Sequence, residues 1–299
     1  MRTFVYHENP SSKHSFYKSG DAWCIDDESR IFAVADSPLR KLIIETKEYP
    51  FDDYGYEAAS TFCNSFVKHT KESIKIELNK EIMKNILLQC NRDILALNKS
   101  LGKGYKDLLN YDVAETVGIG GIIHDGILCY GGVEDCYVNV LRGSSLDNLA
   151  KWNYQIKKAS KYVDYISSQG KLEEYIPSEL IGKLSQENYW EPLWCSHLRN
   201  NINARDNKGN LVGWGCFTGE EEIEDFIQVH ELKLELGDHI LLFSDGMIPL
   251  LENEKFMKWF LENVNNSAKF QYEMRLKSLD LLNGTNDVDK EKTLIYYRY

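Results

Sequence analysis

The most constraining feature of the sequence is a short apolar run that ends in a carboxylate near the C-terminal end. Residues 240–243 (Ile-Leu-Leu-Phe) are consecutive apolar residues, which predicts a short buried strand. Ser244, Asp245 and Gly246 follow directly. Because burial of an unpaired charge is costly, the strand has to end here, and Asp245 is expected to face a cation, a cluster of donors or water.

Two further aspartates stand at the ends of predicted strands near the N-terminus. Asp36 ends the apolar run 31–35, and Asp21 begins a predicted strand over 21–25. Taken singly, each aspartate is better explained as a turn or cap residue. The three together favour a site for a hard divalent ion such as Mg²⁺ or Mn²⁺, which prefers oxygen ligands.

Four blocks of the sequence, in order, resemble the metal-dependent serine/threonine protein phosphatases, the type 2C or PPM class, in a divergent bacterial form. Asp21-Ala22 resembles the early Asp-Ala block of that family, and residues 32–36 resemble its Val-x-Asp-Gly strand. Residues 133–142 resemble its Gly-Asp-Ser hairpin, and residues 241–246 resemble its Ser-Asp-Gly strand. The resemblance implies an α+β fold: a four-layer α-β-β-α sandwich, with two antiparallel sheets flanked by helices.

The hydrophobic periodicity is compatible with such a sandwich. Apolar stripes of period 3.6 predict helices, and short apolar runs predict strands. The His-Asp-Gly sequence at 124–126 predicts a hairpin turn, and glycines in the strand 113–123 predict a close approach of the two sheets. The predicted helices cover 54–69, 77–99 and 254–282, and the predicted strands cover 4–6, 21–25, 31–35, 113–123, 127–130, 137–141, 225–232, 240–246 and 293–297.

The domain organisation is expected to be simple. No repeat or low-complexity tract divides the chain, so residues 1–299 are predicted to form a single domain. Residues of about 143–210 are rich in aromatic side chains, and the PPM class carries a variable insertion in this part of the chain. Two interpretations of this segment stay open: a surface that faces substrate or partner, and ordinary covering structure.

Charge and cysteine content argue against several classes of function. Lys plus Arg number 35 and Asp plus Glu 46, a net charge of −11, which disfavours broad binding to nucleic acid or to an anionic membrane. No apolar stretch reaches the roughly 18 residues of a membrane span. The seven cysteines show no zinc or redox spacing, and an odd number without a signal peptide favours the reducing cytoplasm. We therefore expect a cytoplasmic protein with no nucleic-acid or membrane partner.

The resemblance also implies a cofactor, namely two Mg²⁺ or Mn²⁺ ions and, in bacterial members, a third. Asp36 would bridge the two ions, and Ser37 would contribute its backbone carbonyl. Asp245 would hold one ion and Asp21 the other. Asp135 matches the hairpin aspartate that supports the third, weaker ion. Asp36 and Asp245 are thus the predicted catalytic residues.

The last metal ligand of the family precedes its terminal strand, where three carboxylates compete in this sequence. Asp289 is the preferred candidate, and Asp287 and Glu291 are the alternatives. Residues two apart share a face of an extended chain, so all three would lie on one side if this segment is already extended. Lys18 and His14 are the candidates for contacting the substrate phosphate, although a solvated loop histidine explains His14 equally well.

The function implied by the resemblance is that of a metal-dependent phosphoprotein (serine/threonine) phosphatase, which hydrolyses phosphomonoesters with a metal-activated water. Its expected partners are a phosphorylated protein substrate and a serine/threonine kinase system. The alternative is a binding or scaffold protein that keeps the fold with little activity. An unrelated metal hydrolase is a third hypothesis, and the acidic charge balance argues against its nuclease form.

Overall fold

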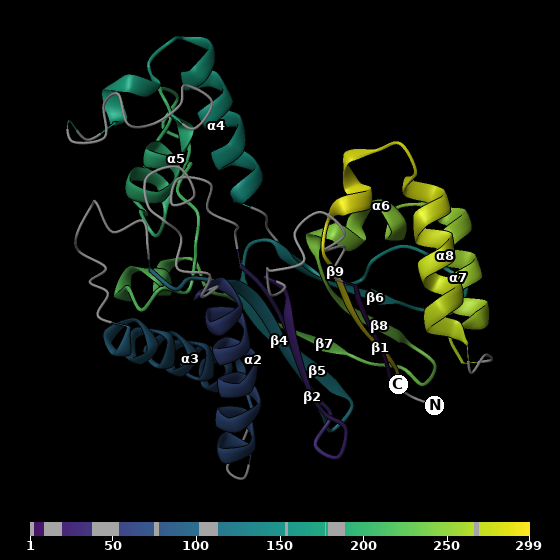
Figure 1. The fold of residues 1–299 in the computed structure, drawn as a ribbon. Coiled ribbons are helices and arrows are strands. Elements are labelled where there is room, and N and C mark those ends of the chain that lie inside the picture. The colour runs from purple at the N-terminus through teal and green to yellow at the C-terminus, as the bar shows by residue number, and fades with distance from the viewer. Residues whose placement is uncertain are drawn as a thin grey trace.

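Two antiparallel β-sheets form the frame of the molecule (Figure 1). The computed structural model describes residues 3–8, 20–37, 54–74, 78–101, 113–152, 155–176, 178, 189–265 and 269–299. The four-stranded sheet has the order β1 (Thr3–Glu8), β9 (Lys292–Arg298), β8 (His239–Ser244), β6 (Cys136–Leu141). The five-stranded sheet has the order β2 (Ala22–Asp26), β3 (Ile31–Asp36), β4 (Val117–His124), β5 (Ile127–Val133), β7 (Gln228–Lys233). The predicted edge strand at the N-terminus is confirmed as β1.

Helices cover the outer face of each sheet. The five-stranded sheet is covered by α2 (Tyr54–Ser73) and α3 (Lys80–Ser100), and the four-stranded sheet by α6 (Ile248–Leu251), α7 (Glu254–Asn263) and α8 (Phe270–Leu282). Side chains alternate along β8: Ile240 and Leu242 pack in the core between the sheets, whereas Leu241 and Phe243 pack against α6 to α8. The predicted four-layer α-β-β-α sandwich is confirmed. In the described part of the chain, no helix has both the length and the apolar character needed to cross a membrane.

The glycines of β4 make room for helix α2. A Cβ atom on Gly118 would lie 2.6 Å from the ring of Phe62, and one on Gly120 would lie 2.3 Å from the ring of Phe66. The two phenylalanines are four residues apart on the buried face of α2, so both rings point at the sheet. The prediction that these glycines let the two sheets approach each other is therefore wrong, because they admit the rings of the covering helix instead.

Element boundaries follow the sequence pattern with two informative differences. The hairpin turn is confirmed, with φ of 47° at Asp125 and 76° at Gly126. The predicted helix 254–282 is two helices, α7 and α8. The strand predicted to include 244–246 ends at Ser244, and Asp245–Met247 form the short 3-10 helix η6. Asp245 therefore stands just beyond the strand end.

Helices of the segment 143–210 extend from one end of the sandwich, where α4 (Ile156–Ser168) and α5 (Trp190–Pro192) lie above α2 and α3 in Figure 1. The described part of the segment also contains the 3-10 helix η1 (Leu172–Tyr175) and the π-helix η4 (Leu193–Leu198). Trp194 packs on Trp214 with ring centroids 4.9 Å apart, which joins this segment to the chain that follows it. The organisation of the chain as one domain with an insertion here stays a prediction.

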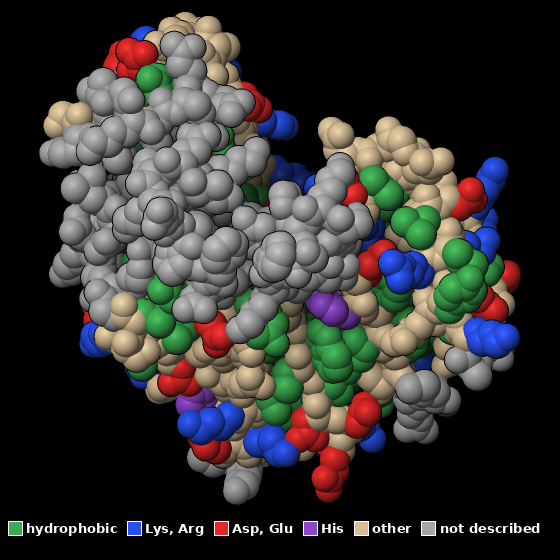
Figure 2. All heavy atoms as spheres, in the orientation of Figure 1, with side chains coloured by type: hydrophobic (Ala, Val, Ile, Leu, Met, Phe, Trp, Pro, Cys, Tyr) green, Lys and Arg blue, Asp and Glu red, His purple; other side chains and the backbone are tan. Residues whose placement is uncertain are grey.

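Helix α8 leaves apolar side chains on the surface. Tyr272, Leu276 and Leu279 are 63%, 48% and 41% exposed, at a spacing that puts them on one face of the helix. Figure 2 shows apolar side chains among charged ones over the region of α7 and α8. The opposite face of α8 buries Phe270 and Met274 against the four-stranded sheet, so the helix is apolar on two sides.

Candidate metal centre

Three carboxylates from distant parts of the sequence meet where the two sheets adjoin. One oxygen each of Asp21, Asp36 and Glu291, here called the carboxylate group, lies within 4.8 Å of the other two. Asp21 precedes β2, Asp36 ends β3, and Glu291 precedes β9. The pairing of Ala22 with Ala35 brings the first two together on the five-stranded sheet. Glu291 reaches them from the four-stranded sheet.

Glycine allows the backbone segments to come close at this point. A Cβ atom on Gly246 would lie 1.8 Å from the carbonyl oxygen of Glu291, and one on Gly20 would lie 2.7 Å from the carbonyl oxygen of Ser37. A larger residue at either position would push apart the segments that carry the carboxylates. The two glycines therefore belong to the site, although they contribute no side chain.

Hydrogen bonds hold Asp21 in position. The Ser244 hydroxyl donates to Asp21 Oδ2 at 2.6 Å, and the backbone N–H of Asp21 donates to Glu291 Oε2 at 3.1 Å. Ser244 in turn accepts a hydrogen bond from the backbone N–H of Thr293 at 3.1 Å. Asp21 is only 2% exposed, so the ends of β8 and β9, and not solvent, set the direction of its carboxylate.

The electrostatics of the carboxylate group favour a bound cation. Burial is the main cause that raises the pKa of Asp21 to about 7; the charges of neighbouring carboxylates also raise it, and hydrogen bonds from two hydroxyl groups oppose the rise. Burial also raises the pKa of Asp36 well above its usual value, and the charges of four nearby carboxylates add to that rise. An all-oxygen set of mutually repelling, buried carboxylates is the kind of ligand set that a hard divalent ion prefers. The residues present therefore fit Mg²⁺ or Mn²⁺.

Asp245 lies beside the carboxylate group but is paired with a lysine. Lys290 Nζ lies 3.3 Å from Asp245 Oδ2 and 3.3 Å from Asp287 Oδ1. Burial lowers the pKa of Lys290, but the charges and hydrogen bonds of Asp245 and Asp287 outweigh this effect, so the pKa is raised and the ammonium stays charged. A predicted metal ligand is thus already neutralised by a side chain of the same protein.

Solved structures cover the whole architecture, although no protein-family model and no curated protein sequence matches the chain. The Mycobacterium tuberculosis serine/threonine phosphatase PstP/Ppp has a TM-score of 0.58 and 14% identity, over 99% of this chain and 97% of that chain. The catalytic domain of PstP in complex with two manganese ions has a TM-score of 0.54 and 14% identity over the same shares. The PPM Ser-Thr phosphatase MsPP from Mycobacterium smegmatis has a TM-score of 0.53 and 13% identity, over 100% and 98%. The chain has the PPM phosphatase fold.

The PPM fold confirms the architecture that the four sequence blocks imply. The identities of 13–14% establish the fold alone, so any activity has to be argued from the side chains of this chain. Those side chains depart from the predicted ligand set at Asp245, which is paired with Lys290, and at the carboxylate that precedes the last strand.

The sequence favours Asp289 as the last ligand, but the structure brings Glu291 to the carboxylate group. Asn286–Asp289 form the 3-10 helix η7, and Asp289 is exposed. The buried Lys292 accounts for this shape, because its ammonium donates to two carbonyl oxygens of the preceding turn at 3.3 and 2.7 Å. The segment is therefore curled, so the extended chain on which the three carboxylates would share one face does not form.

The other predicted site residues lie near the group or outside the described residues. The Tyr137 hydroxyl donates to Asp135 Oδ1 at 2.6 Å, and burial followed by the charge of Asp245 raises the pKa of Asp135. Asp135 thus stands on the turn between β5 and β6, within electrostatic reach of Asp245. His14 and Lys18, the predicted phosphate contacts, lie outside the described residues.

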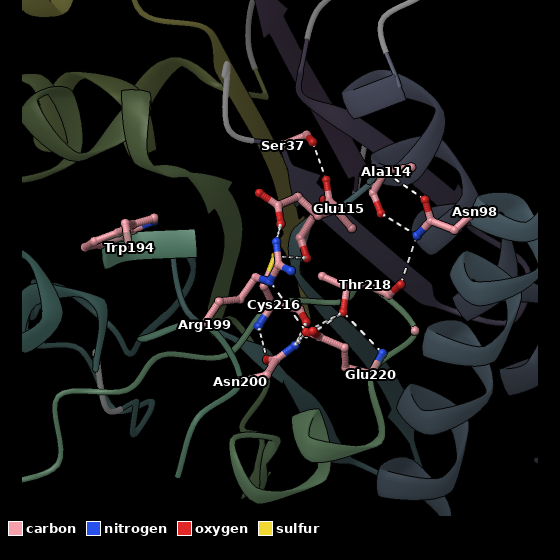
Figure 3. A network of polar contacts seen from close by, with 12 residues as sticks. Ser37, Asn98, Ala114, Glu115, Trp194, Arg199, Asn200, Cys216, Thr218 and Glu220 are labelled. Carbon is pink, nitrogen blue, oxygen red and sulfur yellow. Dashed lines mark hydrogen bonds and ion pairs between the residues drawn. The ribbon is translucent and has the colours of Figure 1, made fainter. Parts of the chain in front are cut away.

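A second buried charged group adjoins the end of β3 (Figure 3). Arg199 Nη1 lies 2.6 Å from Glu115 Oε2, and Arg199 Nε lies 3.4 Å from Glu220 Oε2. The side chains of Arg199 and Glu115 are 7% and 3% exposed. Asn200 Nδ2 donates to Glu220 Oε2 at 2.6 Å. We call these four residues the Arg199 network. It ties the segment 143–210 to the chain that enters β4.

Hydrogen bonds from side-chain hydroxyls to backbone carbonyl oxygens connect the Arg199 network to Asp36. The Thr116 hydroxyl donates to the carbonyl oxygen of Asp36 at 2.7 Å, and the Ser37 hydroxyl donates to the carbonyl oxygen of Glu115. The backbone on both sides of the peptide bond between residues 36 and 37 is therefore fixed by the segment that Arg199 anchors. The only sequence signal for this role is an arginine that directly follows a largely apolar run.

Proposed function

We propose that the chain is a divalent-metal-dependent phosphatase that hydrolyses phosphomonoesters, with phosphoserine or phosphothreonine of a protein as substrate. The observation that carries the proposal is the convergence of Asp21, Asp36 and Glu291 at the adjoining ends of three strands within a PPM fold. A likeness of fold alone would not carry it. A serine/threonine kinase system would supply the substrate. The seven free thiols support a reducing, cytoplasmic setting.

The three carboxylates would hold Mg²⁺ or Mn²⁺, which when bound supplies Lewis acidity toward the phosphoryl oxygens and lowers the pKa of a coordinated water. The side chains of this chain provide the positioning. Ser244 and the Asp21–Glu291 hydrogen bond fix two of the carboxylates, and Thr116 fixes the backbone of Asp36. Preorganised ligands of this kind need no rearrangement when the charge of the transition state develops.

Hydrolysis of p-nitrophenyl phosphate tests the proposal. We expect turnover that requires Mn²⁺ or Mg²⁺ and stops in EDTA. Turnover should fall at least ~100-fold in Asp36→Asn, because losing a direct metal ligand should lower activity more than losing a residue that supports a ligand. Asp125→Asn is the matched control: Asp125 is exposed on a hairpin turn with φ of 47°, a conformation that Asn tolerates. Turnover that persists undiminished in excess chelator would overturn the proposal.

A second candidate function is a phosphate-group or metal-binding scaffold with little turnover. The ion pair between Lys290 and Asp245 favours it, since a ligand that is committed to an ammonium cannot at the same time serve a metal ion. The two functions separate in one experiment. A scaffold would bind Mn²⁺ with an affinity that Asp36→Asn abolishes, yet would release no phosphate from phosphopeptides or p-nitrophenyl phosphate.

A further inference from the structure

We propose that the ammonium group of Lys290 takes the place of a second divalent ion at Asp245, so that the chain binds one divalent ion and not two. The inference rests on the proposed function in that it takes the carboxylate group to hold an ion. It differs from the expectation of two ions, which follows from the resemblance and not from the side chains of this chain.

The geometry of Lys290 carries the inference. Its Nζ bridges two carboxylates from two elements, Asp245 on η6 and Asp287 on η7, at 3.3 Å each. The three side chains are 46%, 30% and 34% exposed, so the ammonium lies between the two carboxylates in a partly exposed position. A metal ion on Asp245 would have to displace this ammonium or lie close to a like charge.

Lys290 is presented by a turn that is itself held in place. The backbone N–H of Lys290 donates to the carbonyl oxygen of Asp287 at 3.3 Å, and its carbonyl oxygen accepts from Lys292 Nζ at 2.7 Å. Lys292 is 1% exposed, and its backbone is paired with Glu8 of β1. The same turn that delivers Glu291 to the carboxylate group therefore delivers Lys290 to Asp245, on the other side.

The carboxylate group and Asp245 differ in the charges that surround them. The carboxylate group combines three acidic side chains, with further acidic charge nearby from Asp135 and Asp245. Asp245, by contrast, has a cation supplied by the chain. The ammonium compensates the charge of Asp245 and a divalent ion would compensate charge in the carboxylate group, whereas a second divalent ion at Asp245 would lie next to the like charge of Lys290.

Mn²⁺ titration calorimetry with native mass spectrometry tests the inference by counting ions. Wild-type protein should bind one Mn²⁺ per chain, and Lys290→Gln should bind a second Mn²⁺. The Kd of this second ion should be at least about tenfold lower in Lys290→Gln than the Kd of any weak second ion in wild type. Lys290→Asp should tighten the second site further by adding a carboxylate. Lys258→Gln removes a positive charge from exposed α7 and should still bind one ion.

The outcomes separate this inference from the proposed function. Two ions in wild type, with the same stoichiometry and affinity in Lys290→Gln, would overturn the inference and leave a metal-dependent phosphatase standing. No Mn²⁺ binding in wild type or in any variant would overturn both. Native mass spectrometry reports the charge-state distribution of the folded protein together with the ion count, so a variant that fails to fold is recognised. If Lys290→Gln fails to fold, Lys290→Asp provides the comparison with wild type.

Discussion

The Arg199 network and the carboxylate group both adjoin the end of strand β3, but they differ in how their buried charges are compensated. In the Arg199 network the guanidinium lies between Glu115 and Glu220, whose charges raise the arginine pKa although burial lowers it. In the carboxylate group, burial and like charges raise the pKa of both Asp21 and Asp36. One group is balanced by the chain, and the other requires a cation from outside.

The difference shows which buried charges serve the fold and which serve function. Removing one partner of a balanced pair leaves an unpaired buried charge, which costs stability. Removing a carboxylate from the unbalanced group relieves repulsion in the metal-free protein and costs only metal affinity. The Lys290–Asp245 pair lies between these cases, because it is balanced but partly exposed. Stability and metal binding should therefore respond to different substitutions.

The largest effect on stability is expected at the balanced group. Arg199→Met should lower the free energy of unfolding by about 3–5 kcal/mol, because it leaves Glu115 buried without its cation. Urea unfolding measures the change. Arg205→Met is the matched control, since Arg205 belongs to the same segment but is exposed, and it should change stability by less than ~0.5 kcal/mol. Equal stability of the two variants would show that the network is not the anchor described above.

A somewhat smaller effect is expected from pH at the unbalanced group. The pKa of Asp21 rises from 3.8 to about 7, so the folded, metal-free protein holds this proton more tightly than the unfolded chain does. The contribution of Asp21 to the free energy of unfolding is therefore greatest below pH 3.8 and is lost as pH rises toward about 7. The loss is on the order of 4 kcal/mol. Saturating Mn²⁺ should reverse the trend, because the ion binds the ionised carboxylates.

The comparison with Asp21→Asn isolates this contribution. Four histidines whose pKa is lowered by burial change stability in the opposite direction near neutral pH: His7, His197, His230 and His239. They are common to both proteins, so they cancel in the difference between the two stability–pH profiles. Between pH 4 and 7, metal-free wild type should lose stability relative to Asp21→Asn, and parallel profiles would contradict the assignment of a buried carboxylate with a raised pKa.

The smallest effect is expected at the hydroxyl that joins the two groups. Thr116→Val removes the hydrogen bond to the carbonyl oxygen of Asp36 and should cost about 1 kcal/mol in urea unfolding. It should also weaken Mn²⁺ binding, measured by calorimetry, because the backbone of Asp36 is released. Thr116→Ser keeps the hydroxyl and should restore both values. Unchanged Mn²⁺ affinity in Thr116→Val would mean that the two groups are independent.

The parts of the structure that depend on local pattern could be predicted from the sequence. The apolar run before Asp245 and the run before Asp36 each become a strand that ends at the aspartate, give or take a residue. Helix α2 follows its apolar stripe, and Asp125-Gly126 forms the turn that its sequence indicates. Each of these features is decided by side chains a few residues apart, so it can be recognised without the partner segment.

The parts that depend on distant partners could not be predicted in the same way. Glu291 and not Asp289 joins the group, because a buried Lys292 curls the turn before β9. The glycines of β4 serve helix α2 and not the facing sheet, which depends on where Phe62 and Phe66 come to lie. Arg199 forms an ion pair with Glu115, which is 84 residues away in the sequence. No local pattern reports which of several lysines or arginines will be buried.

The pairing of the first strand with the last has a consequence for synthesis on the ribosome. β9 lies between β1 and β8, and Asp21 meets Glu291 across a separation of 270 residues. Translation is vectorial, so the four-stranded sheet has no centre, and the carboxylate group has no third member, until β9 has left the exit tunnel. Nascent chains that carry Asp21 and Asp36 therefore lack the complete carboxylate group, and release of β9 is the step that brings Glu291 to it.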